Sequence, residues 1–238
     1  MTDPKGRPAA PRPDNPWLSL AINIAIPAVI LMKLSGDDRL GPAPALVIAL
    51  AFPLIYGLQD FARQRRFNFI SALGVVSILL TGGIGLLELD PKWIAVKEAA
   101  VPAVIGLAVV ASMRTRWPIV RSLLYNDRII DVPAVDDALE RYGNHSDFER
   151  VLGVASWLLA SSFFLSSVLN FVLARLIVKS PAGSAAFNEE LGRMTALSYP
   201  VIVLPSMAVM MIALWYLFRN IKRLTHMDLE EIFHPRHR

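Results

Sequence analysis

The sequence predicts an all-α protein, a polytopic transmembrane helical bundle of about six spans with both termini in the cytoplasm. Its 238 residues are 54% hydrophobic and only 18% charged, and the mean hydropathy is +0.46. About a quarter of the residues of an average soluble domain are charged. A soluble fold cannot hide this much apolar surface, so the composition excludes a soluble enzyme, a disordered scaffold and a nucleic-acid reader, despite the net charge of +4.

Six apolar stretches approach the ~20 residues that an α-helix needs to cross the hydrocarbon core of a bilayer. They cover residues 17–32, 40–58, 69–89, 93–112, 151–177 and 198–218. The first stretch follows a basic tail, as a secretory signal does, but Pro27 interrupts it and no small-x-small cleavage pattern comes after it. We therefore expect spans one to four within residues 17–112 and spans five and six within residues 151–218.

Three segments outside the spans are expected to be cytoplasmic. Residues 1–16, with five prolines, predict a disordered basic tail. Residues 113–150 form a loop in which the pattern from Val135 to Arg150 predicts one short helix. Residues 219–238 form a basic tail, and its apolar residues recur at near-helical spacing. They predict an amphipathic helix on the anionic inner leaflet or, as an open alternative, a simple continuation of the last span. These residues are Ile221, Leu224, Met227 and Ile232.

The orientation follows from the lysines and arginines between the spans, because basic residues in short loops stay on the cytoplasmic side. The two tails and the second and fourth loops together carry 17 of them, and the alternate loops carry 7. Both termini are therefore expected in the cytoplasm.

A shift of 75 residues aligns two proline-containing stretches of the chain. It lays Pro27-Ala-Val-Ile30 on Pro102-Ala-Val-Ile105. One interpretation is a pair of inverted-topology halves, spans one to three and four to six, as in many secondary transporters. The alternative is a chance match, because apolar spans use few residue types.

Ionisable groups in or near a span are costly and mark the natural place to look for function. The sequence predicts an outward-facing polar pocket, to which the third, fourth and fifth spans would contribute. Its candidate residues are Glu88, Asp90, Lys97, Glu98, Asn170 and Arg175. Lys97 and Glu98 are consecutive on a helix, so we expect each to find a partner elsewhere. The alternative is that these charges form ion pairs that fix helix packing, with serines such as Ser162 and Ser166 bonded to their own helix.

Small residues predict close packing or bending of the third and fourth spans. Gly82, Gly83 and Gly85 let another backbone approach the third span. Pro102 frees the carbonyl four residues earlier, at Glu98, so it predicts a hinge in the fourth. A homodimer through Gly82 and Gly85 is an open alternative.

The sequence offers no support for catalysis, for a metal site or for a cofactor. It has no cysteine, and no nucleophile elbow, phosphate-binding glycine loop or zinc-protease helix. His145, His226, His234 and His237 are scattered without the spacing of a zinc site.

One acidic stretch on the fourth loop resembles, faintly, aspartate-rich magnesium and diphosphate sites. Its aspartates are Asp127, Asp131, Asp136 and Asp137. We interpret it as the solvated acidic start of a helix, because no second acidic cluster lies on another cytoplasmic loop.

The run from Gly82 to Glu98 resembles a known family. Its Gly-Gly and Leu-Leu pairs, followed by Asp90 and Lys97, are similar to the pattern of the intracellular septation protein A family of bacterial inner-membrane proteins. Asn15-Pro-Trp17, Leu40-Gly-Pro42 and Trp93 to Gly106 are closer still to a longer proteobacterial branch of uncharacterised proteins. Glu98 differs from the shorter members, which tend to carry proline there, and the fourth loop is larger.

The resemblance implies a multi-pass protein of the bacterial inner membrane that acts in cell envelope maintenance or septation. It implies no enzyme activity, and its partners would be the lipid bilayer and other envelope or division membrane proteins. The alternative is a small-solute or lipid-precursor transporter that uses the polar pocket around Glu98.

Overall fold

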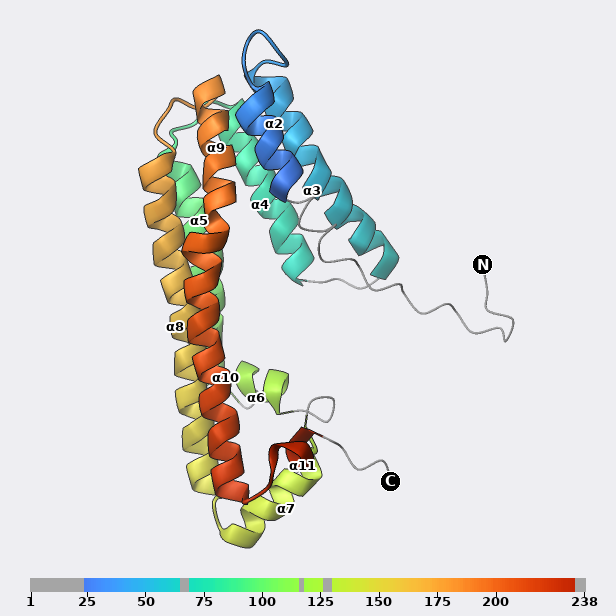
Figure 1. Cartoon of the computed structure of the whole chain (residues 1–238), viewed down its shortest axis with the longest axis vertical. Helices are drawn as coiled ribbons and strands as arrows, with labels where there is room; N and C mark the ends of the chain where they lie inside the picture. Colours follow the sequence, from blue (N-terminus) through green and yellow to red (C-terminus); the bar gives the residue numbers. More distant parts are fainter. Residues whose placement is uncertain (1–23, 65–68, 116–117, 126–129, 234–238) are drawn as a thin grey trace, which may run out of the picture. The chain divides into compact units, whose positions relative to one another are not determined.

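The computed structural model describes residues 24–64, 69–115, 118–125 and 130–233, and every regular element within these ranges is helical (Figure 1). The elements are α2 (Ile26–Leu34), α3 (Pro42–Gln64), α4 (Phe69–Leu86), α5 (Lys92–Ser112), α6 (Ile119–Leu124), α7 (Val132–Tyr142), α8 (His145–Ile177), α9 (Ala185–Ser198), the π-helical turn η2 (Tyr199–Val203), α10 (Leu204–Thr225) and α11 (Leu229–Phe233). The predicted all-α class is therefore confirmed for this part of the chain.

Four of the described helical segments are long and apolar enough to cross a membrane. They are Pro42–Gln59, Lys92–Ser112, His145–Ile177 and the continuous run Ala185–Thr225. They correspond to the predicted second, fourth, fifth and sixth spans. The predicted third span contains the shorter apolar stretch Gly74–Leu86. The predicted first span lies partly outside the described residues, and so does the whole of the predicted tail at residues 1–16. The chain is thus compatible with a multi-pass membrane protein.

The chain divides into two compact units. The first unit comprises Met1–Pro91 and Ile177–Ala196, and the second comprises Lys92–Leu176 and Leu197–Arg238.

In the first unit, α2, α3 and α4 follow one another as packed neighbours, and α9 joins them from a distant part of the sequence (Figure 1). α9 packs closely on α2 because Gly192 has no side chain: a Cβ there would lie 2.9 Å from the Ala28 carbonyl oxygen. Phe187 of α9 and Leu46 of α3 are 0% and 2% exposed, and they form the centre of this unit.

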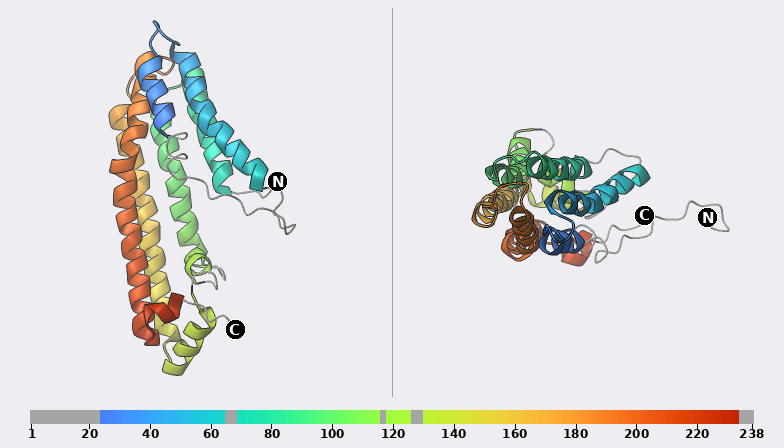
Figure 2. Two further views of the ribbon diagram at one scale, coloured as in Figure 1. Left: turned by 45° about the vertical axis from the view of Figure 1, so that its right-hand side comes forward. Right: turned by 90° about the horizontal axis from the view of Figure 1, so that it is seen from above.

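In the second unit, α5, α8 and α10 run side by side (Figure 2). The Phe164 ring of α8 lies against Gly106 of α5, where a Cβ would come within 3.0 Å of it. Large apolar side chains such as Trp157 and Trp215 remain more than half exposed, as expected for helices that face lipid.

The short helices α6, α7 and α11 gather at one end of the second unit (Figure 1). Their apolar residues share a core with the ends of α5, α8 and α10, and we call this assembly the cap. Its fully buried members include Ile130, Val135, Leu139, Phe148, Ile221 and Ile232.

The cap corrects the expectation of one short helix over Val135 to Arg150. α7 ends at Gly143, whose φ of +68° is the left-handed conformation that glycine adopts without steric cost. A new helix, α8, begins at His145 and continues into the membrane-compatible segment. The chain turns here because the apolar faces of both helices must reach the same core.

Of the two structures predicted for residues 219–238, the continuation of the last span is correct as far as Thr225. α10 runs unbroken to that residue and ends at His226, which has a φ of +57°. Ile221, Leu224 and Ile232 are buried in the cap, so the amphipathic helix expected on the lipid surface packs against protein instead.

The sixth predicted span begins too late in the sequence. The structure extends the helical run back to Ala185, through α9 and η2. α9 carries Glu189 and Arg193 on its exposed side, which lowers its mean hydropathy and concealed it from a search for apolar stretches. A π-helical turn follows at Pro200, which has no N–H to donate to a regular α-helix.

Candidate functional site

The six residues of the predicted polar pocket fall into the two compact units. Glu88 and Asp90 belong to the first unit, and Lys97, Glu98, Asn170 and Arg175 belong to the second.

Lys97 and Glu98 form an ion pair with each other. The Lys97 Nζ lies 2.7 Å from Glu98 Oε1, and the side chains are 7% and 28% exposed. The expectation that neighbouring positions would not pair is wrong, because it considered only the 100° between their Cβ directions. The long, flexible lysine side chain reaches the carboxylate of the next residue, and this contact offsets part of the cost of burying its charge.

The polar stripe on α8 bonds to its own helix. Ser162 Oγ donates to the Leu159 carbonyl at 2.7 Å. Asn170 Nδ2 donates to the Ser166 carbonyl at 2.8 Å and also lies 3.3 Å from the Ser166 hydroxyl. This is the alternative that the sequence left open, in which such groups fix helices rather than line a site. Arg175 lies in the last turn of α8 and is exposed.

One polar contact between helices was missed by the sequence reasoning. Ser167 of α8 donates its hydroxyl to the Ala99 carbonyl of α5 at 2.8 Å. Ala99 lies three residues before Pro102, where a proline loosens the carbonyls of the preceding turn. The signal that could have found it was a serine on a neighbouring span at the depth of that proline.

The three glycines of α4 do not share one role. A Cβ at Gly82 would lie 3.1 Å from the Leu50 side chain, and a Cβ at Gly85 would collide with Leu46 and lie 3.4 Å from Phe187. A Cβ at Gly83 would have no such neighbour within 4 Å. Gly82 and Gly85 therefore pack against side chains of the first unit, whereas Gly83 has no such contact among the described residues.

Glu88 and Asp90 lie in the turn after α4, and both are exposed. Glu88 has a φ of +52°, and the following residue, Leu89, donates its N–H to the Ile84 carbonyl at 2.9 Å, which closes the helix end. The Glu88 side chain covers Gly183, where a Cβ would lie 2.9 Å from Glu88 Cγ. The structure thus shows Glu88 in a helix-ending role.

The cap contains a polar cluster that the sequence did not single out. The Tyr125 hydroxyl donates to Asp136 Oδ1 at 2.6 Å, and the Tyr125 ring packs 5.0 Å from the ring of Phe148. Arg121 pairs with Glu149 at 2.7 Å and lies 5.7 Å from the centre of the Tyr125 ring. Burial, together with the bond to Asp136, holds the pKa of the Tyr125 phenol above its ordinary value of 10.0.

The acidic loop behaves as a helix start. Asp131 Oδ1 accepts the Ala134 N–H at 3.1 Å and caps α7. The Asp131 backbone N–H donates to the Ile232 carbonyl at 2.9 Å and ties the loop to α11. Asp137 is exposed, and Asp127 lies outside the described residues. Within the described part of the chain, no three acidic or histidine side chains are close enough together to hold a metal ion.

The histidines lie apart from any such cluster. His145 begins α8, and the His226 ring packs 4.7 Å from the ring of Tyr142. His234 and His237 lie outside the described residues.

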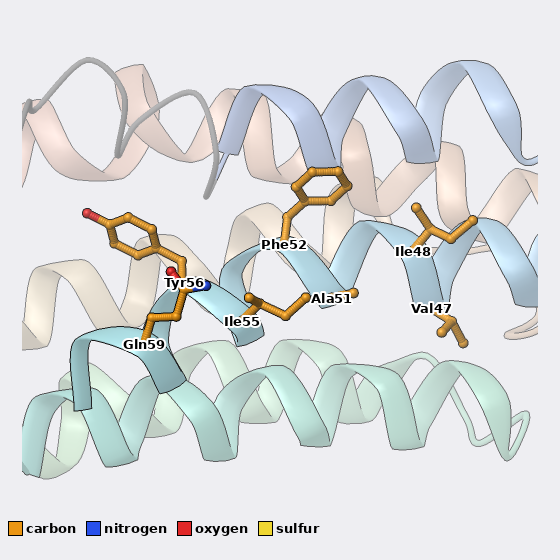
Figure 3. Close-up of a pocket in the computed structure, with 7 residues that line it drawn as sticks. All are labelled: Val47, Ile48, Ala51, Phe52, Ile55, Tyr56 and Gln59. Atoms are coloured by element: carbon orange, nitrogen blue, oxygen red, sulfur yellow. The ribbon is translucent and has the colours of Figure 1, made fainter. Parts of the chain in front are cut away.

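An apolar groove runs along α3 in the first unit (Figure 3). Its volume is about 470 Å³. A single helix supplies the residues that line it, and its two polar members, Tyr56 and Gln59, lie at one end (Figure 3). This is the pattern of a lipid-facing surface rather than of an enclosed binding site.

Comparisons of this chain with protein-family models, with curated proteins and with solved structures found no match.

Proposed function

We propose that this chain is a non-enzymatic protein of the bacterial inner membrane that acts in envelope maintenance or septation through contacts with other membrane proteins. The membrane-compatible helices support the placement in a bilayer. The bacterial membrane and the process rest on the resemblance of the Gly82–Glu98 run to the septation protein family.

One observation favours a packing role over a transport role. Lys97 and Glu98 of α5 pair with each other, and Ser162 and Asn170 bond to their own helix. A transporter needs polar groups that change partners when a substrate or a proton binds. Groups that already satisfy one another suit a rigid helix bundle.

The cap adds a second support. A membrane protein without catalytic groups can act by presenting a rigid surface to a partner, and the cap is built on a continuous apolar core. The count of lysines and arginines supports a cytoplasmic position for this end of the second unit.

The alternative function is a small-solute or lipid-precursor transporter centred on Glu98. Lys97 is only 8% exposed, although it lies in a helix apolar enough to cross a membrane. Buried charges of this kind are expensive and frequently functional. A transporter of this kind requires a carboxylate at position 98, and a carboxylate at the neighbouring position 97 would not replace it.

Exchange of the two charges separates the alternatives. In a deletion strain, cell shape, septa and envelope permeability are imaged after complementation with the wild type, with Lys97→Glu/Glu98→Lys and with Glu98→Gln, all at matched membrane levels. The exchanged variant keeps an ion pair at this point of α5 but moves the carboxylate to the neighbouring position.

Full rescue by the exchanged variant supports the packing role. Its failure at normal protein levels contradicts that role and leads to transport assays. Glu98→Gln alone is expected to reduce the protein level, because it removes the carboxylate that pairs with the buried Lys97 ammonium at 2.7 Å. If the deletion strain has no envelope or septation phenotype, the proposed process is wrong.

A further inference from the structure

The exposed residues of α10 form one continuous stripe along the helix. They recur every three or four positions, which is the spacing of a single helix face. The opposite face is buried in the second unit and in the cap. In chain order the exposed residues are Leu204, Met207, Ala208, Met211, Ile212, Trp215, Arg219, Lys222 and Arg223. We call this set the outer stripe.

The chemistry of the outer stripe changes at Trp215. Every member before this residue is apolar, and every member after it is basic. Tryptophan prefers the boundary between hydrocarbon and headgroups, and basic residues prefer the headgroup side of that boundary. Arg219 lies four residues past Trp215, about 6 Å along the helix axis, and Arg223 lies another four residues on. The outer stripe therefore passes from an apolar surface to cations at the depth of lipid phosphates.

The protein does not neutralise the two arginines of the outer stripe. Among the described residues, neither Arg219 nor Arg223 forms an ion pair. Lys222 differs from them, because its Nζ lies 2.7 Å from Asp228 Oδ1. The segment from Trp215 to Thr225 contains no acidic residue. An anion that pairs with the two guanidinium groups therefore has to come from outside this helix.

Arg219 is also held in place by an aromatic ring. Its Cζ lies 4.9 Å from the centre of the Trp215 ring, within the range of a cation–π contact. This contact restricts the arginine side chain before any ligand arrives, so less rotamer entropy is lost when the guanidinium binds an anion. The tryptophan thus positions the cation at the boundary between the apolar and the basic parts of the outer stripe.

α8 shows the contrasting arrangement at the same end of the second unit. It also carries an exposed tryptophan, Trp157, and an exposed arginine, Arg150, seven residues away. Here, however, Arg150 Nη1 lies 3.2 Å from Asp147 Oδ1. The neighbouring charge, Glu149, pairs with Arg121 at 2.7 Å. The charges of α8 at this end are therefore balanced within the protein, whereas those of Arg219 and Arg223 on α10 are not.

We propose that the basic end of the outer stripe binds an acidic phospholipid, which has a phosphate and no ammonium in its headgroup. The phosphate pairs with the guanidinium groups of Arg219 and Arg223, and an acyl chain lies along the apolar members that include Met211. A zwitterionic headgroup fits less well, because its ammonium finds no carboxylate on the outer stripe. The lysine and arginine count supports a cytoplasmic position for this end, so the lipid belongs to the inner leaflet. The inference rests on the bilayer placement in the proposed function.

The purified full chain is tested by native mass spectrometry in detergent, with phosphatidylglycerol or phosphatidylcholine added at equal concentration. The two headgroups share the phosphate, but only phosphatidylcholine carries a compensating cation. Phosphatidylglycerol is therefore expected to be retained more. Equal retention of the two lipids would overturn the proposal.

Charge-neutral variants locate the site. Arg219→Gln and Arg223→Gln are each expected to lower the retention of phosphatidylglycerol about threefold, as the loss of one exposed charge contact implies. Arg150→Gln is the matched control, because it removes the same charge at the same end of the second unit, where Asp147 already pairs with it. It is expected to behave as the wild type. An equal loss in Arg150→Gln and Arg223→Gln would show a general charge effect and contradict the site.

Inorganic phosphate tests the assignment to a lipid. It is expected to displace phosphatidylglycerol only at a large excess, because it lacks the acyl chains that contact the apolar part of the outer stripe. Displacement at equal concentration would refute the assignment. Lipid retention does not depend on the envelope phenotype, so this test and that of the proposed process fail separately. Release of the chain from membranes by salt without detergent would refute the bilayer placement on which both rest.

Discussion

Replacement of Gly85 by alanine adds one methyl group to the tightest contact between α4 and its neighbours. The new Cβ would collide with the Leu46 side chain and lie 3.4 Å from Phe187 Cε1. These two side chains are 2% and 0% exposed, so neither can move aside into open space. Overpacking of this kind costs about 1–3 kcal/mol.

Gly83→Ala is the matched comparison. Both glycines lie in α4, two residues apart, and both substitutions gain about 1 kcal/mol from the higher helix propensity of alanine. At Gly83 the new methyl group meets no such neighbour within 4 Å. The propensity gain cancels in the comparison, so Gly85→Ala is expected to be less stable than Gly83→Ala by the overpacking cost, about 1–3 kcal/mol.

The assay is thermal unfolding of the full chain, purified in one detergent and followed by the loss of the monodisperse fraction after heating. We expect Gly83→Ala to match or exceed the wild type in its midpoint temperature and Gly85→Ala to fall below both. Gly85→Leu should lower the midpoint further. Equal midpoints for the two alanine variants would refute the packing of α4 on α3 through Gly85.

Three further outcomes follow from the second unit. Tyr125→Phe removes the hydrogen bond to Asp136 and is expected to lower the free energy of unfolding by about 1.5–3 kcal/mol, the range for a bond to a charged group; chemical denaturation measures it. Because the pKa of Tyr125 is raised by folding, the unfolded chain loses this proton first, so the native state loses stability as the pH rises above the ordinary value of 10.0. Tyr125→Phe should flatten that part of the pH profile, and an unchanged alkaline profile would show that the phenol does not keep its proton. Gly143→Ala places a side chain at positive φ and should lower the unfolding midpoint by the equivalent of about 1 kcal/mol; no change would mean that the turn between α7 and α8 adopts another conformation. In a double-mutant cycle of Lys97→Met and Glu98→Gln, the loss of stability in the double variant should be smaller than the sum of the two single losses, because each single variant breaks the same 2.7 Å ion pair; additive losses would contradict the ion pair.

The hydropathy of the sequence predicted α5 and α8 well. A long apolar segment in a bilayer has to pair its backbone N–H and C=O groups internally, and an α-helix does so within one segment. Hydropathy missed the start of the helical run at Ala185, since α9 mixes charged and apolar residues and its helix depends on packing against α2. It also joined α7 to α8, because the turn at Gly143 is a single residue within a continuous amphipathic pattern.

The candidate site shows the same division. The sequence marked Lys97 and Glu98 as unusual, because a charged residue in an apolar helix is visible without a structure. The expectation that they would not pair with each other was wrong, since helix geometry restricts Cβ positions but not the reach of a long side chain. Ser167 and Tyr125 were not singled out, because a serine or a tyrosine near a span is common and only its neighbour distinguishes it.

The sequence by itself determined that this chain is an all-helical protein with several helices suited to a membrane, because hydropathy over some twenty residues is a local property. It also marked the proline of α5 and the glycines of α4 as special positions. Only the tertiary structure decided that Gly85 contacts α3 while Gly83 does not, that α7 and α11 build a cap with the ends of α8 and α10, and that α9 packs on α2 at Gly192. These features depend on which faces of distant segments meet, and local sequence carries no record of that.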